Sequence, residues 1–106
     1  MHGLQVVATD GPDSVEFTEL PDPTGDALVV DVRAAGVGFP DLLMARGEHQ
    51  IRRPVPFTLG WEAAGVISAA PDDSRFKEGE EVVTLTLGSF AEKVAAVPEA
   101  TFPKPP

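Results

Sequence analysis

Short segments in which apolar and polar residues alternate run through most of the chain, and this pattern predicts β-strands. The clearest segment is residues 27–35, where Leu28, Val30 and Val32 would share one face. Five further segments have the same character and are predicted strands: residues 4–9, 15–20, 62–70, 81–87 and 90–97. The Asp-Gly-Pro-Asp cluster at residues 10–13 should close a hairpin between the first two strands.

One short helix is predicted among these strands. Pro40 suits the first turn of a helix and Asp41 favours its positive N-terminus, so residues 40–46 should form a helix that ends near Gly47. Residues 47–59 carry two prolines and mixed charge, and we expect a long ordered loop there. Six strands around one helix predict a mainly β fold, a small and partly open β-barrel with long loops.

Length and composition narrow the class of protein. The 106 residues suit one compact domain, and 42% hydrophobic and 24% charged residues are typical of globular proteins. No apolar run approaches the roughly 20 residues of a membrane-spanning helix. The N-terminus lacks the pattern of a secretory signal and the chain has no cysteine. We therefore expect a cytoplasmic protein without a membrane partner.

The net charge and the small number of metal-ligating residues exclude further classes of protein. The net charge of −9, from 17 acidic and 8 basic residues, opposes binding to nucleic acid or anionic lipid. Arg46, Arg52 and Arg53 form a local exception, which is either an attraction site for a phosphate or an acidic partner, or a solvated loop. With no cysteine and only His2 and His49, the sequence predicts no zinc site.

Three glycines interrupt the predicted strands or follow them closely. Gly36 and Gly38 flank one residue at the end of the strand at 27–35. They indicate either a sharp turn at a barrel corner or a backbone that a ligand approaches closely. Gly65 inside the strand at 62–70 indicates a bulge, a close backbone contact or another barrel corner.

Four linked motifs resemble the medium-chain dehydrogenase/reductase superfamily in order and spacing. They read AAGVGFPD at residues 34–41, RG at 46–47, PVPFTLGWEAAGVI at 54–67 and FKEGEEV at 76–82. The resemblance extends to GSFAE at residues 88–92 and is nearest to the quinone oxidoreductase branch. It implies that residues 1–106 form a single GroES-like domain, the catalytic half of such enzymes, without the Rossmann cofactor domain.

The resemblance also implies which residues face the reaction. Zinc-dependent members have a cysteine ligand at Gly38 and a histidine ligand at Trp61, so chemistry without zinc is implied here. Asp41 and Glu62 match acidic positions of that pattern, and we expect them to serve hydrogen bonding and helix capping.

In the quinone oxidoreductase branch, an asparagine commonly occupies the position of Gly38, and a tyrosine the position that aligns with His49. Backbone groups at Gly38 could partly replace the asparagine amide. His49 is the candidate catalytic residue, as a hydrogen-bond donor or acid, or else a solvated loop residue. Gly38, Phe39 and Trp61 are candidates for the cofactor and substrate cleft, although Trp61 could equally be a core aromatic.

The function implied is the catalytic-domain part of a zinc-independent, NADPH-dependent quinone oxidoreductase or enoyl-reductase-like protein. No Gly-x-Gly-x-x-Gly unit for a dinucleotide is present, so we expect weak NADPH binding and no activity without a Rossmann-type domain in cis or in trans. A quinone-like small molecule would be the substrate. The alternative is a non-catalytic GroES-like binding or scaffold module. A true co-chaperonin is disfavoured because it would leave the motifs unexplained.

Overall fold

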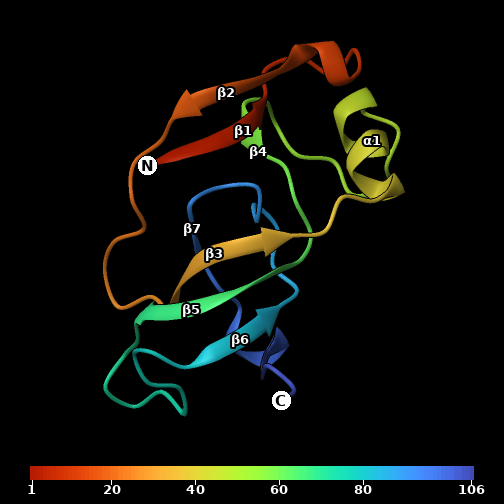
Figure 1. Cartoon of the computed structure of the whole chain (residues 1–106). Coiled ribbons are helices and arrows are strands. Elements are labelled where there is room, and N and C mark those ends of the chain that lie inside the picture. Colours follow the sequence, from red (N-terminus) through yellow and green to blue (C-terminus); the bar gives the residue numbers. More distant parts are fainter.

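A computed structural model describes residues 1–106 as two antiparallel sheets and one helix (Figure 1). The three-stranded sheet has the order β2-β1-β4, from β1 (His2–Val6), β2 (Val15–Glu19) and β4 (Phe57–Thr58). The five-stranded sheet has the order β7-β3-β5-β6-β8. Its strands are β3 (Val29–Ala35), β5 (Ala63–Ala69), β6 (Glu81–Thr84), β7 (Lys93–Ala95) and β8 (Thr101–Pro103). The mainly β, partly open architecture with one short helix is confirmed.

Two strands lie where none was predicted. β4 forms within the expected loop at 47–59, because Phe57 and Thr58 pair with Val6 and Gln5 of β1. β8 pairs with β6 near the C-terminus. The structure therefore has eight strands, and the prediction of six was wrong.

All six predicted strands are shorter in the structure, and two of them are shorter by at least three residues. The segment at 81–87 leaves the sheet after Thr84, and Gly88, with φ of 93°, turns the chain so that its N–H bonds to the oxygen of Gly60. The segment at 90–97 keeps only β7 as a regular strand, because its first residues pair with a different sheet.

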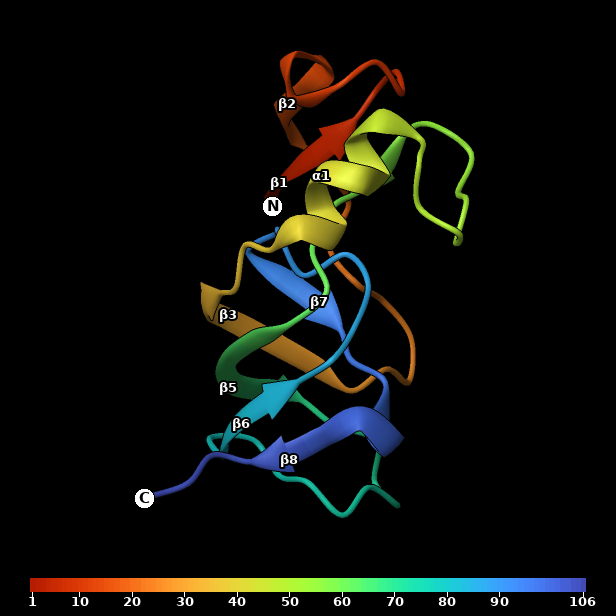
Figure 2. The same ribbon diagram turned by 90° about the vertical axis from the view of Figure 1, so that its right-hand side faces the viewer.

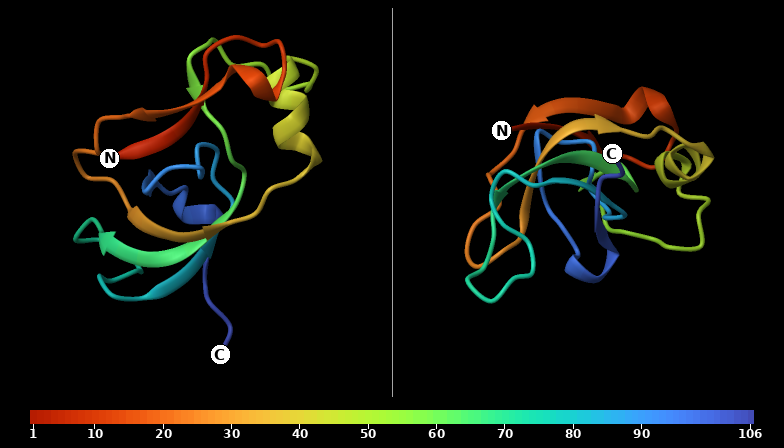
Figure 3. Two further views of the ribbon diagram at one scale, coloured as in Figure 1. Left: turned by 45° about the horizontal axis from the view of Figure 1, so that its top comes forward. Right: turned by 60° about the horizontal axis from the view of Figure 1, so that its bottom comes forward.

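Residues 90–95 join the two sheets. The N–H of Leu4 donates to the oxygen of Phe90 and the N–H of Glu92 to the oxygen of His2, while β7 pairs with β3. Figure 3 shows this part of the chain between the two layers. The barrel is thus continuous along this segment and open elsewhere.

Each sheet has its own hydrophobic core. The five-stranded sheet buries seven residues: Leu28, Val30, Ile67, Phe76, Val82, Val94 and Ala96. The second core lies between the three-stranded sheet and α1 (Phe39–Arg46), and consists of Val6, Met44, Ala45, Phe57 and Leu59. Figure 2 shows α1 beside β1, at the end of the molecule opposite the C-terminus. Neither α1 nor a shorter helical turn has the length and apolar character to cross a bilayer.

Gly65 lies at a close approach between β3 and β5. Val32 pairs with Gly65 and Ala34 with Ala64, so Arg33 is an extra residue that forms a β-bulge in β3. A Cβ atom on Gly65 would lie 2.0 Å from the backbone oxygen of Asp31. The predicted close contact is confirmed, and the bulge next to Gly65 is in the neighbouring strand.

Candidate functional site

The candidate residues gather at one end of the five-stranded sheet. β3 ends at Ala35 and β5 begins at Ala63, and these two residues are paired. Because the strands are antiparallel, the segments 36–38 and 60–62 leave the sheet at the same edge. The N–H of Gly36 donates to the oxygen of Glu62 at 3.3 Å. The sheet therefore places Gly38 and Trp61 on neighbouring connections.

Asp41 holds the start of α1. Its Oδ2 accepts a hydrogen bond of 2.9 Å from the N–H of Gly38, and its own N–H donates to the oxygen of Gly38 at 3.1 Å. The expectation that Asp41 caps the helix is confirmed. The carboxylate is buried, and its Oδ1 has no hydrogen-bond partner.

This cap changes the interpretation of Gly38. The backbone at Gly38 is extended, with φ of −138°, and the nearest atom to a Cβ there would be Cδ of Pro40 at 3.4 Å. Neither a positive φ nor a close contact requires glycine at this position. Its N–H donates to Asp41, so the backbone donor expected to replace an asparagine amide is already in use.

Gly36 lies against the end of the Glu62 side chain, which is exposed and can shift, so the contact alone does not require glycine there. A Cβ on Gly36 would lie 2.2 Å from Oε1 of Glu62. The two residues line an apolar cavity of about 540 Å³ between the ends of β3, β5 and β6, which also includes Ala63, Leu85 and Phe102. Glu62 is exposed and makes no side-chain hydrogen bond, so the expectation that it serves capping finds no partner in the structure.

His49 and Trp61 are in contact. Their ring centroids lie 5.0 Å apart with the planes tilted by 47°. Trp61 is half-buried and also packs against the core beneath α1, so it is at once a core aromatic and the support of His49. Phe39, at the first turn of α1, is 67% exposed.

A backbone hydrogen bond selects the tautomer of His49. The N–H of Ile51 donates to Nδ1 of His49 at 3.0 Å, so Nδ1 carries no proton there. In the neutral ring the proton is on Nε2, which no other protein atom contacts in a hydrogen bond. His49 thus offers one N–H donor that is free for a ligand.

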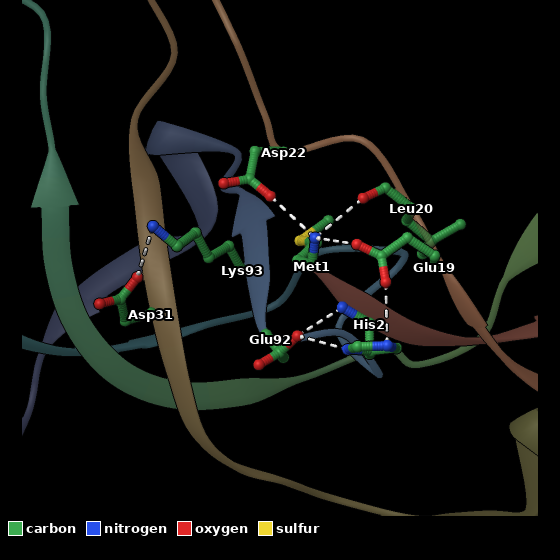
Figure 4. A network of polar contacts seen from close by, with 8 residues as sticks. All are labelled: Met1, His2, Glu19, Leu20, Asp22, Asp31, Glu92 and Lys93. Atoms are coloured by element: carbon green, nitrogen blue, oxygen red, sulfur yellow. Dashed lines mark hydrogen bonds and ion pairs between the residues drawn. The ribbon is translucent and has the colours of Figure 1, made fainter.

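An ionic network at the N-terminus was not foreseen from the sequence (Figure 4). Nε2 of His2 lies 3.0 Å from Glu19 and Nδ1 lies 3.3 Å from Glu92, while the Met1 α-amino group lies 3.0 Å from Asp22. The hydrogen bond between these last two groups raises the pKa of the amino group and lowers the pKa of Asp22. A hydrogen bond from the backbone N–H of His2 lowers the pKa of Glu92. The network ties β1 to β2 and to residue 92.

The side chains of this structure form no cluster that could ligate a metal ion. No three His, Asp or Glu side chains are grouped so that they could hold a metal ion. Gly38 and Trp61 have no side-chain atom that ligates zinc.

Comparisons with known proteins agree on one family. The model of the alcohol dehydrogenase GroES-like domain matches residues 24–106. The quinone oxidoreductase-like protein 2 of Rattus norvegicus is 43% identical over 96 residues, covering 87% of this chain and 27% of that protein.

Solved structures give the same result. A probable oxidoreductase from Mycobacterium abscessus has a TM-score of 0.94 and 41% identity, over 99% of this chain and 34% of that one. Mycobacterial Rv1454c complexed with NADPH has a TM-score of 0.88 and 28% identity, with coverage of 99% and 34%. The chain spans about a third or less of the length of each of these proteins.

Proposed function

Since the chain belongs to the alcohol dehydrogenase GroES-like domain family, on the quinone oxidoreductase branch of the medium-chain dehydrogenase/reductases, we propose that it forms the substrate-side wall of an NADPH-dependent reductase. The reaction would reduce a quinone-like or enone-like small molecule without zinc. The contact of His49 with Trp61, beside the segment that carries Gly38, is the observation that carries this proposal.

The residues at this edge fit one side of a flat, uncharged ring system. The indole of Trp61 and the exposed ring of Phe39 offer apolar surfaces against which a nicotinamide or a quinone can pack. NADPH, when bound, supplies the hydride. The chain has no Gly-x-Gly-x-x-Gly turn, so a Rossmann-type domain in cis or in trans would hold the pyrophosphate of the cofactor.

His49 would act on the oxygen of the substrate. Its Nε2–H donates a hydrogen bond to a carbonyl oxygen, and this bond strengthens as negative charge develops there. The bond from the N–H of Ile51 and the contact with Trp61 hold the imidazole in one orientation. Loss of one such donor typically lowers kcat by about 10²-fold or more.

In this proposal the reaction proceeds without zinc, because the side chains at this edge include too few zinc ligands. A catalytic zinc site needs three protein ligands, and thiolate, imidazole and carboxylate groups provide them. Gly38 and Trp61 offer none of these, and Asp41 already accepts the hydrogen bond that caps α1. Polarisation of the substrate oxygen would therefore come from His49.

A chimeric enzyme tests the proposal. This chain would replace the matching third of the Mycobacterium abscessus oxidoreductase, and NADPH oxidation would be followed with a series of quinones. We expect turnover by the chimera, none by the isolated chain, and a kcat about 10²-fold lower for His49→Ala in the chimera. The matched control His2→Ala, at the remote ionic network, should leave kcat unchanged.

Three outcomes would reject parts of the proposal. Turnover by the isolated chain would disprove the need for a nucleotide-binding domain. An unchanged kcat in the His49→Ala chimera would remove that residue from the reaction. A folded chimera that binds NADPH but reduces no quinone or enone would favour the alternative, a non-catalytic binding or scaffold module.

A further inference from the structure

A separate polar cavity lies at the C-terminal end of α1. It has a volume of about 190 Å³, and Arg52 and Arg53 form its charged wall. Thr9, Met44, Gly47 and Phe57 also line it. None of the cleft candidates Gly38, Phe39 and Trp61 lines it, so it is distinct from the site described above.

Protein contacts hold the guanidinium group of Arg53 on one side and leave N–H donors without a partner on the other. Its Nη1 donates to the backbone oxygen of Thr58 at 3.2 Å, and the guanidinium carbon lies 5.4 Å from the centre of the Phe57 ring. These contacts fix the plane of the guanidinium, which has five N–H donors. Only one interaction of this group with a protein acceptor is present, so several donors remain for a ligand.

The arginines of this cavity have no carboxylate partner. The salt bridges of the structure use the α-amino group, His2, Lys93 and Lys104, and none uses an arginine. This is unexpected in a chain with 17 acidic and 8 basic residues. Two guanidinium groups without counter-ions at one cavity attract an anion.

The end of α1 does not cancel this attraction. Carbonyl groups at a helix C-terminus carry partial negative charge and repel anions. Here the carbonyl oxygens of Leu43, Met44 and Ala45 all accept backbone hydrogen bonds from residues outside the helix, from Glu48, Gly47 and Gly11. The helix therefore presents few free acceptors to the cavity.

We propose that this cavity binds a phosphoryl group. Arginine pairs with phosphate through two parallel N–H···O bonds, and a dianion is neutralised by two guanidinium groups. A volume of about 190 Å³ is several times the ~30 Å³ share of one water molecule, which leaves room for a phosphoryl group and its ester oxygen. The site depends on the cavity alone and stands whether or not His49 acts in a reduction.

The phosphoryl group has two possible sources, which share this chemistry. One is the adenosine phosphate of a nicotinamide cofactor, and the other is a phosphate-bearing substrate such as an acyl thioester of coenzyme A. Ile51, which donates to His49, also lines the cavity, so a ligand bound here lies close to the loop that carries His49. Titration with 2′,5′-ADP and with coenzyme A separates the two sources.

The first experiment follows backbone amide NMR signals of the 106-residue chain during titration with pyrophosphate at constant ionic strength. We expect saturable shifts centred on Gly47 and residues 51–53. Arg52→Gln and Arg53→Gln should each weaken binding roughly tenfold, because each loses a charge-assisted pair. Arg52→Lys, which keeps the charge without the planar fork, should bind between Arg52→Gln and the unmodified chain.

The matched control is Arg33→Gln, which removes the same charge from an exposed arginine outside the cavity. It should bind pyrophosphate as the unmodified chain does. The proposal is overturned if the shifts do not saturate, if they centre elsewhere, or if Arg33→Gln weakens binding as much as Arg52→Gln. Circular dichroism of each variant establishes that it is folded, and Arg52→Gln, at an exposed residue, is the variant that decides the result.

Discussion

Gly65 lies against Asp31 so closely that the backbone oxygen of Asp31 occupies the place of a side chain on Gly65. We predict that Gly65→Ala destabilises the fold by about 3 kcal/mol, because the contact is with backbone and neither strand can yield without losing its register. Urea unfolding followed by circular dichroism measures the change.

Gly38→Ala is the matched control for this prediction. The backbone at Gly38 is extended and no atom lies closer than 3.4 Å to the added carbon, so the free energy of unfolding should change by less than about 0.5 kcal/mol. Equal losses in the two variants would show that the contact with Asp31 does not limit the sheet.

The pattern of alternating residues predicted the strands that have a long buried face. Val30 of β3 and Ile67 of β5 are almost completely buried, and each lies at the centre of a predicted strand. β4 and β8 could not be predicted in the same way, because they are two and three residues long. Their pairing partners, β1 and β6, lie far away in the sequence or beyond a loop, and alternation within so short a segment carries no signal.

The helix cap provides a second prediction. Asp41→Ala removes the acceptor for the N–H of Gly38 and should lower the free energy of unfolding by about 1 kcal/mol. Asp41→Asn keeps an oxygen for this bond and removes the buried, unpaired charge on the other oxygen, so it should lose less. Chemical unfolding of both variants tests the order, and a greater loss for Asn than for Ala would contradict the capping role.

The ionic network predicts how stability depends on pH. The pKa values of Asp22 and Glu92 are lowered from their ordinary values of 3.8 and 4.5, so their contribution is present above these values and is lost as the pH falls through the folded-state pKa. The pKa of the Met1 amino group is raised from 8.0, so its contribution is full below pH 8 and is lost as the pH rises through the folded-state value. The urea midpoint should therefore be highest between about pH 5 and pH 8.

Variants of the network separate the two limbs of this profile. Glu92→Gln should flatten the acid limb, because its pKa is lowered mainly by the backbone N–H of His2. Asp22→Asn and acetylation of the α-amino group each break the same hydrogen bond, so each should flatten both limbs. Acid limbs that remain parallel in the variants and the unmodified chain would show that other carboxylates determine the acid sensitivity.

The contact of His49 with Trp61 predicts a spectroscopic effect. His49→Ala uncovers one side of the indole, so the emission of Trp61 should shift to longer wavelength and its quenching by acrylamide should increase. Trp61 is the only tryptophan, which makes the signal specific. The matched variant His2→Ala, whose ring stacks on Phe17 instead, should leave the emission unchanged, and no difference between the two variants would contradict the contact.

The candidate site was predicted only in part. The motifs indicated His49, Trp61 and Gly38, and the structure brings the first two together. The bond from Ile51 to His49 and the use of the Gly38 N–H by Asp41 depend on backbone directions in a loop and a helix cap, which residue types do not reveal. The sequence also did not reveal that Arg52 and Arg53 form no salt bridge, because it shows charges but not the distances between them.

Residues 90–95 hold the two layers of the protein together. The first half of this segment is hydrogen-bonded to β1 and its second half to β3, so each layer of the protein is held by a different part of the same ribbon. The N–H of Glu92 donates to His2 of β1 and its oxygen accepts a hydrogen bond from Val32 of β3, so this single residue takes part in the hydrogen bonding of both layers.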